Sequence, residues 1–248
     1  MPEAEWWAMA PPGVSIHAAR ISAKAPWASW TDDGRDVVLA PDMAHGAAQL
    51  ASLAPSAVVV AHTSSSIVGG PGWDHAVTAK LVEILPENCA ITTNGVDCIG
   101  ALSASGVSAP FVVFPPWFGD AINARGLEYL AALGVRASGH IRQIPAKKWQ
   151  HLRPEELYGA FMHVEQRTDM LFDQIVQACP AEADGVLIVG TGVRCVGIIA
   201  ALETALGRPV VTANQASLWR CLGLAGVDAA ISGYGTLFAK SSVPADPR

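Results

Sequence analysis

The chain has 248 residues, of which 51% are hydrophobic and 15% charged, and its formal net charge is −6. This length is ample for one large domain or two smaller lobes, and the acidic balance gives no support to nucleic-acid or anionic-membrane binding. No apolar run approaches the roughly 18–20 residues of a membrane span. The acidic start at Glu3 and Glu5 lacks the basic and apolar regions of a signal peptide.

The hydrophobic pattern alternates strands with helices, which is typical of an α/β protein with buried parallel strands. In the first half, strands are expected at 5–10, 37–40, 57–61 and 90–93, and helices at 42–53, 73–85 and 96–105. In the second half, strands are expected at 111–114, within 135–153, at 185–189 and at 210–212, and helices at 120–133, 154–178, 195–206 and 216–224. The Ser- and Pro-containing tail 241–248 is expected to be loose.

The cysteine spacing and the sequence motifs give no indication of a metal site or of a bound cofactor. The five cysteines are an odd number without metal-type spacing, so we expect reduced thiols in a cytoplasmic protein. The sequence contains no HExxH motif, no Walker motif and no GxGxxG opening a first βα unit. Neither a metal nor a nucleotide cofactor is therefore expected.

A polar stretch, Ala61-His62-Thr63-Ser64-Ser65-Ser66, follows the apolar run at 57–60. In an open α/β sheet, ligands bind beyond the carboxyl ends of the strands, where loops and helix N-termini converge. An unperturbed histidine titrates near neutral pH, so His62 is a candidate general acid or base. The neighbouring hydroxyl and N–H groups could bind a carboxylate. The competing explanation is structural, with His62 bonded in a loop and the hydroxyls capping the next helix.

The two halves of the chain share short matches in the same order. The matched segments are 11–12 with 115–116, 61–63 with 189–191, and 92–94 with 212–214. We interpret them as a drifted duplication that forms two pseudo-symmetric lobes, each a mostly parallel sheet flanked by helices. The first lobe would comprise 1–107 plus 209–240, and the second 108–208. A ligand in the cleft between them would meet residue 62 on one side and residue 190 on the other.

Four segments carry a resemblance to a known family: VVVAHTSSS, FPPWFGDAINARGLEYL, GVLIVGTGVR and GRPVVTANQASLWRCLGLAGV. Together they resemble the aspartate/glutamate racemase superfamily, in its branch of maleate cis-trans isomerase and arylmalonate decarboxylase. The resemblance spans about residues 5–230. It implies two α/β lobes with the active site in the cleft between them, and cofactor-independent chemistry at a carbon next to a carboxylate.

The resemblance also exposes a departure at the catalytic positions. Racemases of this superfamily use one thiol per lobe, isomerases use one as nucleophile, and the decarboxylase keeps a single thiol that protonates an enediolate. The matching positions here are His62 and Gly190, so a two-thiol racemase is not expected and the covalent isomerase route lacks its nucleophile. Trp117 stands in place of an aromatic hydroxyl and could line a pocket for an aryl group. The substrate-binding residues implied by the resemblance are Pro11, Pro12, Thr63, Ser64, Ser65, Trp117, Gly190, Thr191, Gly192 and Asn214.

We therefore predict a lyase of the decarboxylase type that acts on a small carboxylic or dicarboxylic acid, aryl or alkenyl, through an enediolate-like intermediate. His62 would be its acid or base. Two alternatives stay open: a maleate-isomerase-like cis–trans isomerase or tautomerase, and a non-catalytic carboxylate-binding protein. A hydrolase using Ser64 with His62 is weaker, because no third orienting residue is evident. The expected partner is a small carboxylate rather than nucleic acid or membrane, and a homo-oligomer is left open.

Overall fold

The computed structural model describes residues 2–239 as a mixed α/β protein in which parallel strands are flanked by helices. The strands are β1 Ala28–Trp30, β2 Val37–Leu39, β3 Ala57–Val60, β4 Ala90–Thr93, β5 Pro110–Phe114, β6 Gly139–Arg142, β7 Gly185–Ile188 and β8 Val210–Thr212. The helices are α1 Pro2–Met9, α2 Pro41–Ala51, α3 Thr63–Gly69, α4 Trp73–Leu81, α5 Asn94–Ala104, α6 Asp120–Ala132, α7 Pro154–Leu157, α8 Thr168–Ala178, α9 Ile199–Leu206 and α10 Ala213–Leu224. The predicted α/β class is confirmed.

The strands form three sheets. A four-stranded parallel sheet has the order β6-β5-β7-β8, the strands β3 and β4 form a separate parallel pair, and β1 and β2 form an antiparallel pair. Strands β5 and β7 are buried along their whole length, because helices cover the sheet. Their uninterrupted apolar runs in the sequence reflect that burial.

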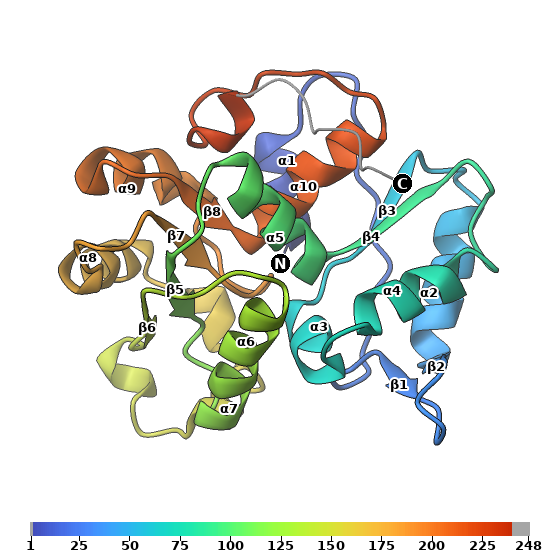
Figure 1. Ribbon diagram of the computed structural model, residues 1–248, viewed down its shortest axis with the longest axis horizontal. Coiled ribbons are helices and arrows are strands. Elements are labelled where there is room, and N and C mark those ends of the chain that lie inside the picture. Colours follow the sequence, from blue (N-terminus) through green and yellow to red (C-terminus); the bar gives the residue numbers. More distant parts are fainter. Residues whose placement is uncertain (1, 240–248) are drawn as a thin grey trace.

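Two separate hydrophobic cores divide the molecule. One surrounds the four-stranded sheet, and the other lies among β1, β2, α2 and α4, with Trp73 fully buried in it. In Figure 1, the four-stranded sheet lies with α8 and α9 at the left of the molecule. The β1–β2 pair lies with α2 and α4 at the right. The predicted boundary at 208/209 falls between β7 and β8, which are paired in one sheet. The exact division into lobes stays a prediction.

The strand predicted at 5–10 is wrong, because this segment belongs to helix α1. Pro2 occupies a position where a helix tolerates proline, and Glu3 and Glu5 lie in the first turn, where negative charge is favourable. The carboxylate of Glu5 is buried and accepts hydrogen bonds from the backbone N–H groups of Cys195 and Val196. The Pro11-Pro12 segment therefore follows a helix and not a strand.

The continuous helix predicted at 154–178 is also wrong. The segment divides into α7, a 3₁₀ turn at Met162–Glu165, and α8. Gly159 weakens the helix, and Phe161 adopts a left-handed conformation with φ of 63°, which ends it. The helix predicted from residue 195 similarly begins as a 3₁₀ turn at Val196–Ile198 before α9. The first break leaves Tyr158 and His163 beside Trp117.

The remaining predicted strands and helices of the described chain occur within a few residues of their expected positions. Residues 2–239 contain no helix that is long and apolar enough to cross a bilayer. The predicted loose tail 241–248 lies outside the described residues.

Candidate active site

His62 occupies the junction between β3 and α3. Its ring stacks on the indole of Trp27, with centroids 4.1 Å apart and an interplanar angle of 11°. Nδ1 lies 2.8 Å from Oγ of Ser65, and this Oγ accepts a hydrogen bond from the backbone N–H of Trp27. The Ser65 hydroxyl proton is thus free to point at Nδ1, and we assign the ring proton of His62 to Nε2 on this basis.

Burial determines the charge of His62. It lowers the pKa of the imidazole from 6.5 to about 4, so the ring is neutral at neutral pH. The expectation of a group that titrates near neutrality is therefore wrong for the protein on its own. A neutral imidazole donates one hydrogen bond, and an anion placed against it would raise its pKa again.

Thr63 begins a buried chain of hydrogen bonds that runs through the helices behind it. Its hydroxyl donates to Oδ1 of Asn94, and Nδ2 of Asn94 donates to the carbonyl of Ala213 and to Oγ of Ser217. Ser217 in turn donates to Asp97 over 2.6 Å. Because the Thr63 proton is committed to Asn94, Thr63 can offer a ligand its backbone N–H but not its hydroxyl proton. The Ser64 hydroxyl has no side-chain hydrogen bond within the described chain and is available.

Asp97 gives this buried network a pH dependence. Burial raises the pKa of Asp97 from 3.8 to about 7, although the hydroxyls of Ser217 and Thr92 oppose the shift. The folded chain holds this proton more tightly than the unfolded chain. The contribution of Asp97 to stability is therefore fully present below about pH 4 and is lost as the pH rises to about 7.

We expect Asp97→Asn, which keeps the shape and removes the charge, to flatten the loss of Tm between about pH 4 and 7. Thermal unfolding across that range measures the effect. The exposed Asp228→Asn serves as the matched control and should keep the wild-type slope. Parallel slopes for wild type and Asp97→Asn would contradict the expectation.

The loop Gly190-Thr191-Gly192 follows β7 and lies against the His62 junction. The hydroxyl of Thr191 donates to the carbonyl of Ala61 over 3.0 Å, which joins two strand ends 130 residues apart in the chain. The structure thus brings together the strand ends that the sequence repeat pairs, with residue 61 next to His62 and residue 191 next to Gly190.

The side-chain amide of Asn214 is engaged within the protein. Nδ2 of Asn214 donates to the Glu5 carboxylate over 2.6 Å and makes longer contacts with the carbonyls of Thr191 and Val193. Its donors are therefore occupied within the protein. Within residues 2–239, no hydrogen bond joins Pro11 or Pro12 to the His62 junction. Burial raises the pKa of the Glu5 carboxyl, and the bonds from Asn214, Val196 and Cys195 oppose this.

Aromatic rings cover Gly192. A Cβ at this position would lie 2.9 Å from Cζ2 of Trp117 and 3.2 Å from Cε2 of Tyr158. Tyr158 stacks on His163 with centroids 4.1 Å apart, and Nδ1 of His163 is buried without a hydrogen-bond partner in the described chain. Tyr158 thus brings a phenol ring to the loop beside Trp117, which carries no hydroxyl. The sequence signal for this pair was Gly159, which interrupts the predicted helix.

A family model and a relative of known activity agree on one family. A family model described as arylmalonate decarboxylase matches residues 26–238. The chain belongs to the arylmalonate decarboxylase family. Arylmalonate decarboxylase of Bordetella bronchiseptica is 29% identical over 216 residues, which cover 86% of this chain and 83% of that protein.

Comparison with solved structures shows that the likeness extends to the fold of the chain. A crystal structure of arylmalonate decarboxylase matches with a TM-score of 0.68 and 25% identity over 81% of this chain and 82% of that chain. The maleate isomerase of Pseudomonas putida S16 matches with a TM-score of 0.69 and 16% identity over 80% of this chain and 76% of that chain, which is a likeness of fold. The predicted superfamily branch and the decarboxylase-or-isomerase class are confirmed. The roles of individual residues stay predictions.

The arylmalonate decarboxylase match begins at residue 26, so α1 with Glu5 and the Pro11-Pro12 segment lie outside it. His62, the loop 190–192 and Asn214 lie inside it. Within residues 2–239, no group of three or more His, Cys, Asp or Glu side chains is placed to hold a metal ion.

Gly190 does not readily accept a side chain. Its φ of 97° lies in the left-handed region, and a Cβ there would come within 3.1 Å of Cγ of Pro115. We expect Gly190→Cys to lower the free energy of unfolding by about 1–3 kcal/mol, as measured by urea unfolding. The matched control is Gly226→Cys, because Gly226 has a φ of 69° but open space around it. Equal losses in the two variants would show that Pro115 imposes no restraint.

Proposed function

We propose that the chain decarboxylates a small malonate-type dicarboxylic acid with an aryl or alkenyl substituent, through an enediolate. The observation that carries this proposal is the Thr191–Ala61 hydrogen bond, which sets the His62 junction against the loop 190–192. Membership in the arylmalonate decarboxylase family supports the reaction type. Activity without an added cofactor and a cytoplasmic location belong to the same proposal.

Neutral donors would hold the substrate. The Ser64 hydroxyl, the backbone N–H groups at Thr63 and Ser64, and those of the loop 190–192 can bind one carboxylate without a buried cation. Such preorganised dipoles stabilise the negative charge that spreads over the two enediolate oxygens after CO₂ leaves. The buried network behind Thr63 and the bond from Asn214 to the Thr191 carbonyl hold these donors in place.

His62 would deliver the proton. A dicarboxylate bound within about 4–6 Å of the ring favours its charged form, so His62 takes up a proton from water as the substrate binds. Cleavage of the bond between the α-carbon and one carboxylate releases CO₂ and leaves the electron pair on the enediolate. The imidazolium then protonates the α-carbon, which yields a monocarboxylate and returns neutral His62. A single titrating group suits this one-sided transfer.

A proton NMR turnover screen in D₂O tests the proposal with aryl- and alkenylmalonates, enoic diacids and hydroxy acids. The expected result is a monocarboxylate that carries one solvent deuterium at the α-carbon, together with CO₂. A double-bond isomer formed without CO₂ would replace the proposal with the isomerase alternative. Ligand binding without turnover of any acid would replace it with a carboxylate-binding protein.

A further inference from the structure

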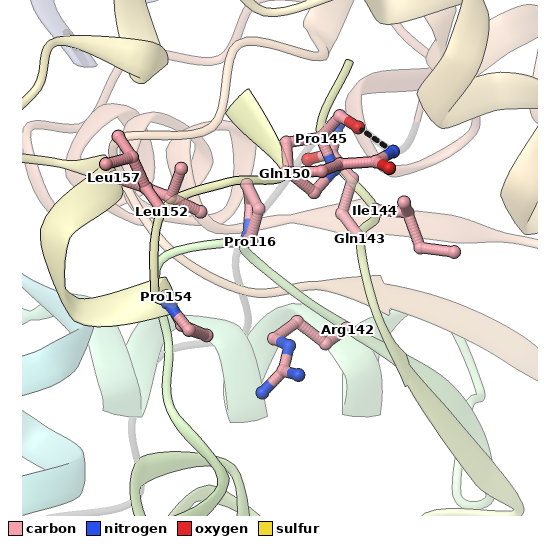
Figure 2. A pocket seen from close by; sticks show the side chains of 9 residues that line it. All are labelled: Pro116, Arg142, Gln143, Ile144, Pro145, Gln150, Leu152, Pro154 and Leu157. Atoms are coloured by element: carbon pink, nitrogen blue, oxygen red, sulfur yellow. Dashed lines mark hydrogen bonds between the residues drawn. The ribbon is translucent and has the colours of Figure 1, made fainter. Parts of the chain in front are cut away.

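A pocket of about 290 Å³ lies where the carboxyl ends of β5 and β6 meet the segment leading into α7. Most of its lining is apolar, as with Pro116, Leu152 and Leu157, and its polar lining includes Arg142 and Gln143. Figure 2 shows the Arg142 guanidinium on one side of Pro116 and the two leucines on the other. At roughly 30 Å³ per water molecule, this volume suits a ligand of about ten non-hydrogen atoms.

Gln143 is the first sign that the pocket is built to hold something. Its backbone N–H donates to the carbonyl of Phe114 over 2.9 Å, which fixes the residue at the sheet edge. The residue is 2% exposed, yet its Oε1 has no hydrogen-bond partner in the described chain. A buried acceptor without a partner is costly, so an N–H or O–H donor on a ligand would gain from reaching it.

Arg142 supplies a positive charge that can bind the carboxylate of a ligand. Its Nη1 donates to Oδ1 of Asp120 over 2.6 Å and contacts the carbonyl of Phe118 at 3.4 Å. Its Nη2 and Nε make no hydrogen bond within residues 2–239. A guanidinium carries five N–H donors, so a carboxylate can bind to these remaining edges while the Asp120 pair persists.

We propose that this pocket is a second ligand site, which binds a small monocarboxylate with an aromatic or branched apolar body and a hydroxyl or amide donor. The carboxylate would bind Arg142, the body would pack on Pro116, Leu152 and Leu157, and the donor would reach Oε1 of Gln143. This binding goes beyond the proposed decarboxylation and does not depend on it.

Two lining residues of the pocket are chain neighbours of residues that contact the loop 190–192. Pro116 follows Pro115, whose Cγ lies 3.1 Å from the Cβ position of Gly190, and Leu157 precedes Tyr158, which covers Gly192. An occupied pocket would therefore press on the two residues that shape the candidate active site. A ligand here is placed to alter substrate affinity by restricting those side chains.

The probe is 4-hydroxyphenylacetate, which has the carboxylate, the ring and the donor, and phenylacetate is its match without the donor. Isothermal titration calorimetry is expected to give 4-hydroxyphenylacetate about 5–10-fold tighter binding, the usual value of one neutral hydrogen bond. Gln143→Met should abolish this difference and leave phenylacetate unchanged. Arg142→Met should weaken both probes. The exposed Gln177→Met is the matched control and should change neither.

Two further variants separate this site from the candidate active site. Leu152→Trp fills the pocket and should remove the binding event that belongs to it, whereas His62→Gln should leave that event intact. The proposed reaction also yields an aryl monocarboxylate, so the candidate active site can add a separate binding event that Leu152→Trp leaves unchanged. If Leu152→Trp removes no binding event, or if His62→Gln removes the same event as Leu152→Trp, the second site is overturned. The absence of binding at about 10 mM probe, a concentration at which even millimolar sites fill, overturns it as well. Should Leu152→Trp fail to fold, the comparison of the two probes on Gln143→Met decides the question alone.

Discussion

Replacement of His62 by glutamine is expected to lower kcat/KM for decarboxylation by a factor of about 10²–10⁴, the usual contribution of a positioned acid or base. Glutamine can keep a hydrogen bond to Ser65 and much of the contact with Trp27, but it cannot transfer a proton. CO₂ release from a malonate that the wild-type chain turns over measures the loss. An active His62→Gln variant would remove the proposed mechanism.

The pH profile tests the same role independently. Because kcat/KM reports the free enzyme, a mechanism that needs protonated His62 predicts a decline of about tenfold per pH unit above pH 4. The decline begins at this low pH because burial lowers the pKa of His62 to about 4. His62→Gln should lose this slope. The exposed His17→Gln is the matched control, since the only hydrogen bond of the His17 ring within residues 2–239 is with Ser15, and it should retain both rate and slope. A flat wild-type profile would instead indicate that neutral His62 acts only as a hydrogen-bond donor.

The parts of the fold that the sequence predicts are those that local burial determines. Strands such as β5 and β7 are buried on both faces, so their composition alone reveals them. Helix α1 could not be predicted in the same way. Its acidic Glu5 is stabilised by the backbone of Cys195 and Val196, about 190 residues away, and short apolar segments fit a helix and a strand equally well.

In the candidate site, too, local sequence predicts some features and distant partners determine the others. The repeat correctly brings the residue 61 and residue 191 strand ends together, because the carboxyl ends of parallel strands carry the loops. The state of each side chain depends on distant partners that no local pattern reveals. The side-chain amide of Asn214 donates to Glu5, and the hydroxyl of Thr63 donates to Asn94. The ring of His62 stacks on Trp27 and is desolvated. Sequence therefore paired the two strand ends more reliably than it assigned the hydrogen-bond donors near them.

Replacement of Asn94 by leucine is expected to lower the free energy of unfolding by about 3–5 kcal/mol, the range for breaking a buried polar network. Asn94 is fully buried, and its amide joins Thr63 at the start of α3 to Ala213 and Ser217 at the start of α10. Leucine has a similar volume, so the loss comes from the broken hydrogen bonds to Thr63, Ala213 and Ser217 rather than from a cavity. Urea unfolding measures it, with the exposed Asn88→Leu as the matched control. A loss below about 1 kcal/mol would show that water or a rearrangement satisfies those groups.

The same variant tests whether the network positions the substrate donors. Without Asn94, the Thr63 hydroxyl is released and the first turn of α3 loses its attachment to α5 and α10. At a temperature where Asn94→Leu remains folded, KM should therefore rise while the pH dependence set by His62 is retained. Ser217→Ala, which removes a more distant link but leaves the Thr63–Asn94 bond, should destabilise the fold with a smaller change in KM. Because a merely structural role would lower Tm in both variants without separating their KM values, the split between them identifies Asn94 as the residue that positions Thr63.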